Sequence, residues 1–224
     1  MNRKRKLFFV FSLLVVLVLV FTQPASAFDG RSGENIVIES DEVIDDDLYI
    51  TAATFVLDGT VNGDLIAMGQ TLTINGEVDG DVLAAGQTVI VNGTVTGAIR
   101  MAGSILLVGE QASIGGDIIA SGYGLELRDG SGIGQDLLFA GSQLLLAGEV
   151  ARHVHVSANA FELRSTVGGD VNAGVGEAGA GVAGPPPTLF MPPSSVSAPT
   201  VEPGLTIAES ARIEGDLSYT QSSE

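Results

Sequence analysis

The sequence repeats a short apolar phrase at a fixed spacing, and this repeat constrains the fold more than any other feature. DLIAMGQTLTINGEVDG (64–80) is followed directly by DVLAAGQTVIVNGTVTG (81–97). The first residue of each copy falls at positions 47, 64, 81, 98, 117, 136, 153, 170 and 216, so the step is 17 or 19 residues until the gap before the last copy. Repeats of this length are typical of solenoid proteins.

When the copies are aligned, five positions are apolar in nearly every copy. In the copy that begins at Asp81 they are Val82, Ala84, Val89, Val91 and Val95. Two pairs of these positions are two residues apart, which places both members of a pair on one face of a strand. Asn-Gly, Asp-Gly and Gly-Gly between the pairs favour tight turns. Each copy is therefore predicted to form a coil of three short strands.

A single coil has no partner for its inward side chains or for its backbone N–H and C=O groups. Stacked coils bury the apolar columns and pair the backbone groups at a spacing of about 4.8 Å. Right-handed crossovers are strongly favoured between parallel strands. The predicted fold is all-β, a right-handed parallel β-helix of about nine coils with 17–19 residues each.

The pattern also gives the limits of the repeat domain. Ile36, Ile38 and Ile44 fit a partial coil that starts near Asn35, and the predicted domain covers residues 34–220. The phase is lost over about 175–202, which predicts a Pro- and Gly-rich insertion at one corner of the coil. Seven of the eight prolines lie in the stretch from Gly174 to Gly204, as expected if the coils need all their backbone donors.

The first 27 residues have the composition of a secretory signal peptide. Four basic residues at 3–6 precede an apolar run at 7–21, and Ala25-Ser26-Ala27 follows. The run is short for a membrane span, and small residues suit signal peptidase. We expect cleavage after Ala27, with an uncleaved N-terminal anchor as the alternative. The protein is then exported, to the cell surface or the extracellular space, with membrane association left open.

The charge excludes some partners. Without residues 1–27, six arginines stand against 27 acidic residues, a net charge of −21, and there is no lysine. Such a surface repels nucleic acid, because few cations are present to neutralise phosphates. The chain also has no cysteine, so its stability must come from packing and not from disulfides.

The repeats resemble those of the bactofilins, a family of polymer-forming cytoskeletal proteins. The phrases that carry the resemblance are VNGDLIAMGQTLTINGEVDGDVLAAGQTVIVNGTVTG (61–97) and IAESARIEGDLSYT (207–220). The resemblance implies right-handed β-helices that stack end to end into filaments and act as scaffolds, often at membranes. The signal peptide indicates similarity to an exported branch of the family.

A column of aspartates is the first candidate for hidden chemistry. Its members follow a glycine or glutamine at one corner, and they are Asp64, Asp81, Asp117, Asp136 and Asp170. Stacked carboxylates resemble the acid pairs of glycosidases or a calcium ladder. The favoured interpretation is that each Asp bonds the backbone of its own turn, because the column runs the length of the rod instead of clustering at one point.

Two other patterns suggest ligands only weakly. His153 and His155 are two residues apart on a predicted strand, on its outer face. They could contribute to a metal site, but a plain surface pair is favoured because no third ligand is near in the sequence. GVGEAG (174–179) matches a dinucleotide-binding pattern, yet Gly and Pro follow it where a helix is required. No metal or cofactor is predicted.

Leu189, Phe190 and Met191 are the most distinctive residues outside the repeat. They stand between PPP and PP in the insertion. Three apolar residues on a semi-rigid arm suit contact with a partner, a membrane or a neighbouring rod. The alternative is that they fold back as a cover over the last coil.

The sequence predicts a non-enzymatic scaffolding protein of the cell envelope, with catalytic residues absent. Its expected partner is a second copy of itself, joined end to end by pairing of the unpaired end strands. Envelope or membrane components are further candidate partners. The alternative function is an exported adhesin or binding module that uses the Pro-rich insertion as its contact.

Overall fold

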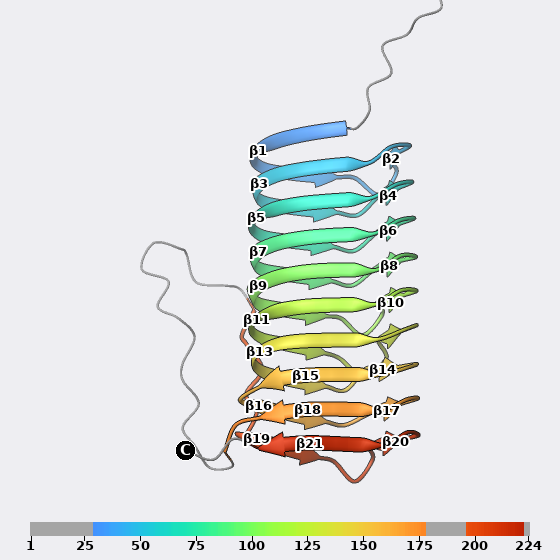
Figure 1. Ribbon diagram of the computed structural model, residues 1–224. Helices are drawn as coiled ribbons and strands as arrows, with labels where there is room; N and C mark the ends of the chain where they lie inside the picture. The colour runs from blue at the N-terminus through green and yellow to red at the C-terminus, as the bar shows by residue number, and fades with distance from the viewer. Residues whose placement is uncertain (1–28, 178–195, 222–224) are drawn as a thin grey trace, which may run out of the picture.

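The structure, a computed structural model, describes residues 29–177 and 196–221. These residues form strands and turns without any helix, wound into a rod of stacked coils (Figure 1). All strand pairs are parallel, and each strand between the two end coils pairs with its equivalents in the coils before and after it. The predicted all-β parallel solenoid of about nine turns is confirmed.

Long strands form one wall of the rod. Seven of them have ten residues each, and they are β1 (Asp29–Ile38), β3 (Leu48–Leu57), β5 (Leu65–Ile74), β7 (Val82–Val91), β9 (Ile99–Val108), β11 (Ile118–Leu127) and β13 (Leu137–Leu146). In the last coils the same path is divided among β15 (Val154–Ala158), β16 (Ala160–Leu163), β18 (Val171–Val175), β19 (Gly204–Ile207) and β21 (Leu217–Gln221).

Two-residue strands form the second wall. They are β2 (Val43–Ile44), β4 (Thr60–Val61), β6 (Glu77–Val78), β8 (Thr94–Val95), β10 (Ser113–Ile114), β12 (Gly132–Ile133), β14 (Glu149–Val150), β17 (Thr166–Val167) and β20 (Arg212–Ile213). They follow one another in chain order along the rod. In the 17-residue coils two residues separate a long strand from its short strand, and in the 19-residue coils four residues do.

The number of strands per coil differs from the prediction of three. The register pairs Ala52 with Gly69 and Thr54 with Thr71, and leaves out only Ala53 and Gln70 between them. The first corner is therefore a bend of one residue inside a continuous strand, because the backbone bonds resume at once on its far side. Only where the strand breaks, as between β15 and β16, does a coil have three strands.

Glycine is required at this corner because successive coils approach closely there. The corner column of β5, β7, β9, β11 and β13 is Gly69, Gly86, Gly103, Gly122 and Gly141. A Cβ atom added to Gly122 would overlap the carbonyl oxygen of Gly103. No side chain is tolerated at such a contact without a shift of the backbone.

The predicted apolar columns form the core. Val82, Val89, Val91 and Val95 are fully buried, as are the equivalent residues of the neighbouring coils. Buried aliphatic groups stacked in this way supply the main stabilisation of the fold. The columns end at the last coil, where Leu217 and Tyr219 are exposed because no further coil among the described residues covers them.

The rod begins earlier than the apolar pattern indicated. β1 starts at Asp29, where a partial coil from near Asn35 was expected, and Arg31 pairs with Ile50 in an inward column. Most side chains in the first half of β1 are polar, so this part of the coil does not follow the apolar pattern of the repeats.

Candidate assembly surfaces

The aspartate column forms a ladder of hydrogen bonds along one corner. Asp47 Oδ1 accepts the backbone N–H of Asp64 at 2.9 Å, Asp64 accepts that of Asp81 at 2.8 Å, and Asp81 accepts that of Ala98 at 2.8 Å. The sequence predicted that each Asp bonds the backbone of its own turn. This prediction is wrong, because each carboxylate accepts its hydrogen bond from the backbone of the next coil. Stacking places the equivalent N–H directly within reach of the side chain.

The ladder continues in the second half of the rod. Asp117 accepts the N–H of Asp136 at 3.0 Å, Asp136 that of His153 at 2.9 Å, and Asp170 that of Asp216 at 2.9 Å. His153 takes an aspartate's place, since its Nδ1 accepts the N–H of Asp170 at 3.0 Å. These carboxylates join coils, which favours a structural role for the column over an acid pair or a calcium ladder.

The two histidines have different surroundings. His153 is half-buried at the corner, and His155 is exposed on β15. In residues 29–177 and 196–221, no three His, Cys, Asp or Glu side chains are grouped so that they could hold a metal ion.

The N-terminal end of the rod carries an ion-pair cluster. The Arg31 guanidinium lies 2.9 Å from Asp29 Oδ2 and 2.7 Å from Glu42 Oε1. The hydrogen bond from Arg31 lowers the pKa of Asp29, and the bonds to Asp29 and Glu42 raise the pKa of Arg31. Arg31 occupies an inward column of the first coil, so this cluster covers the end of the apolar core with charged groups.

The same end is strongly acidic. Besides Asp29, its first coil carries seven acidic residues, namely Glu34, Glu39, Asp41, Glu42, Asp45, Asp46 and Asp47. Arg31 is the one cation among residues 29–47. Two such ends repel each other at low ionic strength, and salt weakens that repulsion.

The C-terminal end differs in both charge and polarity. Its last coil exposes three side chains that stand in inward columns, with Ile207 43%, Leu217 41% and Tyr219 54% exposed. β19, β20 and β21 each pair with a strand on one side only among the described residues. Residues 204–221 contain three acidic residues and one arginine. This end presents apolar groups and unpaired strand edges.

The insertion returns to the rod as a strap, residues 196–203, that runs along its outer surface (Figure 1). Val201 is 1% exposed, and its N–H donates to Gln143 Oε1 at 3.0 Å. A Cβ atom at Gly124 would lie 2.9 Å from Pro199 Cδ, so the strap lies directly on β11. The predicted contact residues Leu189, Phe190 and Met191 lie outside the described residues, as does the predicted signal peptide.

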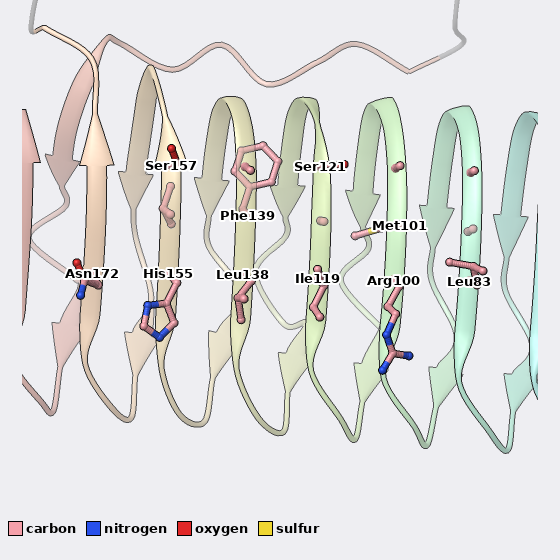
Figure 2. A pocket seen from close by; sticks show the side chains of 16 residues that line it. Leu83, Arg100, Met101, Ile119, Ser121, Leu138, Phe139, His155, Ser157 and Asn172 are labelled. Carbon is pink, nitrogen blue, oxygen red and sulfur yellow. The ribbon is translucent and has the colours of Figure 1, made fainter. Parts of the chain in front are cut away.

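A shallow groove of about 740 Å³ runs along the outside of the long strands. One row of residues that lines it follows successive coils, from Leu83 through Arg100, Ile119, Leu138 and His155 to Asn172 (Figure 2). A second row, two residues further along each strand, has small side chains: Ala85, Ala102, Ser121, Ala140 and Ser157. The apolar columns predicted the core but gave no sign of this outer row.

Sequence reasoning missed two other features. Arg31 could have been found by continuing the 19-residue register back from Ile50. The sequence pattern did not indicate the contacts of Gln143 and Gly124, because the strap that contacts them lies far along the chain and outside the repeat.

Within the part of the chain that the structure describes, no helix has the length and apolarity to cross a membrane.

Comparison with known protein families gives a match over part of the chain. Residues 35–135 match the family model described as Bactofilin, polymer-forming cytoskeletal. No curated protein and no solved structure gives a significant match to the chain. The matched stretch runs from within β1 to just past β12. It includes the first phrase on which the resemblance was stated (61–97), and the second phrase (207–220) lies outside it. Residues 35–135 of this chain therefore form a domain of the bactofilin family.

Proposed function

We propose that this protein is an exported scaffold of the cell envelope whose rods polymerise end to end. The family match supports a structural, polymer-forming protein. The observation that carries the end-to-end mechanism is the C-terminal coil, with its unpaired strand edges and its exposed Ile207, Leu217 and Tyr219. A strand edge with apolar neighbours binds another edge by adding backbone hydrogen bonds and burying apolar area.

The two ends make assembly conditional. Joining C-terminal ends buries apolar side chains and brings together little charge. Any contact that includes an N-terminal end brings in its acidic residues and its Arg31 cluster. Growth beyond pairs of rods therefore requires salt or a divalent cation to screen the N-terminal charge.

Electron microscopy of the purified protein across a series of NaCl and CaCl₂ concentrations tests this function. We expect short particles at low salt and filaments at higher ionic strength. A strictly monomeric protein under every condition overturns the polymer proposal.

The proposed location rests on residues 1–27 as a signal peptide. Fractionation of the producing cells, together with N-terminal sequencing of the exported protein, tests it. A mature N-terminus at Phe28 outside the cytoplasmic membrane supports export. Recovery of the protein in the cytoplasm with residues 1–27 intact contradicts it.

A non-enzymatic role is part of the same proposal. Its support is the aspartate ladder, where carboxylates along the whole rod accept backbone bonds from the next coil. A screen for saccharide hydrolysis or elimination tests it. Turnover that is abolished by an Asp136→Asn substitution would restore the catalytic interpretation.

The second candidate function is a binding module that uses the insertion. The observation that favours it is the anchoring of both described ends of the insertion, since Val175 and Val201 are buried in the rod. Deleting residues 179–194 keeps these anchors and removes Leu189, Phe190 and Met191. Lost binding to cell surfaces by a rod that still folds and polymerises supports this function, and unchanged binding argues against it.

A further inference from the structure

The outer face of the long strands is apolar where a solvated surface is expected. Leu83, Ile119 and Leu138 point outward from β7, β11 and β13 and are 39–46% exposed. Tyr49 and Met68 are exposed in nearby coils of the same face. Apolar patches of this extent on the surface of a protein often mark a contact site.

This face is also free of carboxylates. Its outward positions before the glycine corner form two rows, and the described residues of the first are Gly30, Tyr49, Ile66, Leu83, Arg100, Ile119, Leu138, His155, Asn172 and Ser218. Those of the second are Ser32, Thr51, Met68, Ala85, Ala102, Ser121, Ala140, Ser157, Gly174 and Thr220. The short-strand wall, in contrast, carries Glu77 and Glu149 at exposed outward positions.

The charge of this face therefore favours a second copy of the chain as its partner. Arg100 is the one arginine in the two rows, and its guanidinium lies 2.9 Å from Asp81 Oδ2 at the corner. The face is close to neutral on a chain of strong negative charge. A second copy can approach this face without bringing carboxylates together, whereas contact through the short-strand wall sets like charges against each other.

The shape of the face is complementary to itself. The first row forms a ridge of large side chains, and the second row has small side chains, with Ala85, Ala102, Ser121 and Ala140 lining the groove beside the ridge. A two-fold axis parallel to the rod, placed between the rows, sets the ridge of each copy over the groove of the other. The two rods then run in the same direction. An axis across the rod would set ridge on ridge.

We propose that this face, defined by Leu83, Ile119, Leu138 and the groove beside them, is a lateral interface between two parallel copies of the rod. This contact goes beyond the end-to-end assembly of the proposed function.

The size of the face sets the strength of the contact. The five coil steps from Tyr49 to Leu138 span about 24 Å, and the face is roughly 15 Å wide. A pair of rods buries on the order of 800 Å² in total, which is less than the 1,200–2,000 Å² of a stable complex. Single rods pair weakly, and rods joined in a filament pair firmly because many faces engage together.

Cysteine cross-linking tests the pairing, and the native chain contains no cysteine to interfere. Ser121→Cys places a thiol on the proposed face, and Thr94→Cys places one at an exposed site on the short-strand wall. With a short bis-maleimide, we expect a dimer from the purified Ser121→Cys protein and little from Thr94→Cys. Equal cross-linking of the two variants overturns the proposal.

A charge substitution provides the second arm. Leu138→Asp in the Ser121→Cys background should reduce the dimer at least tenfold, while Thr94→Asp should leave it unchanged. Circular dichroism confirms that each variant folds. If Leu138→Asp cross-links as well as its parent, the face is not the interface.

Electron microscopy and vesicle binding separate the remaining outcomes. Filaments two rods wide support the pairing, and so do lateral dimers without filaments. Lateral dimers without filaments also overturn end-to-end growth, but they leave the lateral pairing standing. Filaments one rod wide overturn the pairing and leave end-to-end growth standing. Cosedimentation with phosphatidylcholine vesicles that is lost in Leu138→Asp, without any cross-linked dimer, assigns the face to lipid and overturns the proposal.

Discussion

The carboxylate of Asp117 accepts a hydrogen bond from the backbone N–H of Asp136, one coil further along the rod, at 3.0 Å. The relationship recurs along the same corner, so each aspartate holds the next coil in register. This use of a side chain distinguishes the corner from an ordinary turn, where an aspartate bonds within its own coil.

Two substitutions of Asp117 distinguish the contribution of its hydrogen bond to stability from the contribution of its charge. Asp117→Ala removes the acceptor, and we expect the free energy of unfolding to fall by about 1 kcal/mol. Asp117→Asn keeps an acceptor oxygen at the same place, so its free energy of unfolding should be closer to that of the native protein. Urea denaturation followed by circular dichroism measures both. Equal stability of the Ala variant and the native protein would show that the ladder contributes nothing.

The glycine corner should tolerate no side chain. In Gly122→Ala the new Cβ atom would overlap the carbonyl oxygen of Gly103, and we expect a loss of at least about 2 kcal/mol because the backbone must move. Gly132→Ala is the matched control, since a Cβ atom there meets nothing within 4 Å. Thermal unfolding compares the two. Similar melting temperatures would contradict the close packing of coils at this corner.

Asp81 makes stability depend on pH in the acid range. The backbone N–H of Ala98, followed by the Arg100 guanidinium, lowers the pKa of Asp81 in the folded protein. The unfolded carboxyl titrates near its ordinary pKa of about 3.9. The stabilisation is therefore complete above that value and is lost as the pH falls through the lower, folded pKa.

The test compares melting temperatures of the native protein and Asp81→Asn from pH 7 down to pH 2. The difference between them should be constant above the ordinary pKa of aspartate and should shrink at lower pH. A difference that does not change with pH would mean that the charge of Asp81 makes no contribution.

The acidic N-terminal end should control the salt dependence of assembly. Glu39 and Asp41 are exposed there, and replacing them with Gln and Asn removes two charges from the joining end. We expect filaments at a lower NaCl concentration, measured by light scattering. The control removes two exposed charges from the middle of the rod, with Glu110→Gln and Asp129→Asn, and an equal shift in this control would rule out a specific effect of the end.

The strap depends on the absence of a side chain at Gly124. Gly124→Ala brings a Cβ atom to 2.9 Å from Pro199 Cδ and 3.3 Å from Ala198 Cβ, so we expect the strap to shift from the rod. Hydrogen exchange at the Val201 amide, which is bonded to Gln143, should become faster. Unchanged protection of that amide would show that the strap adapts without leaving its place.

The core was predictable because burial repeats with the coil. Val82, Val89, Val91 and Val95 share their columns with apolar residues of neighbouring copies, and stacking is the arrangement that buries all of them. The joining of two predicted strands into one could not be foreseen, since the bend takes a single residue and leaves no gap in the pattern.

Features that break the repeat were the hardest to predict. Arg31 lies in a core column but is charged, and it is stable there because Asp29 and Glu42 pair with it at the open end of the rod. The contact of Val201 with Gln143 joins residues 58 positions apart. No local spacing encodes such a contact.

Cryo-electron microscopy of the purified protein under filament-forming conditions tests the central claim most directly, because it shows how one rod meets the next. The account predicts a continuous axial spacing of about 4.8 Å, with the strands perpendicular to the filament and β21 paired to a strand of the adjoining rod. Single rods at every ionic strength, or filaments in which both ends of each rod remain free, would contradict it.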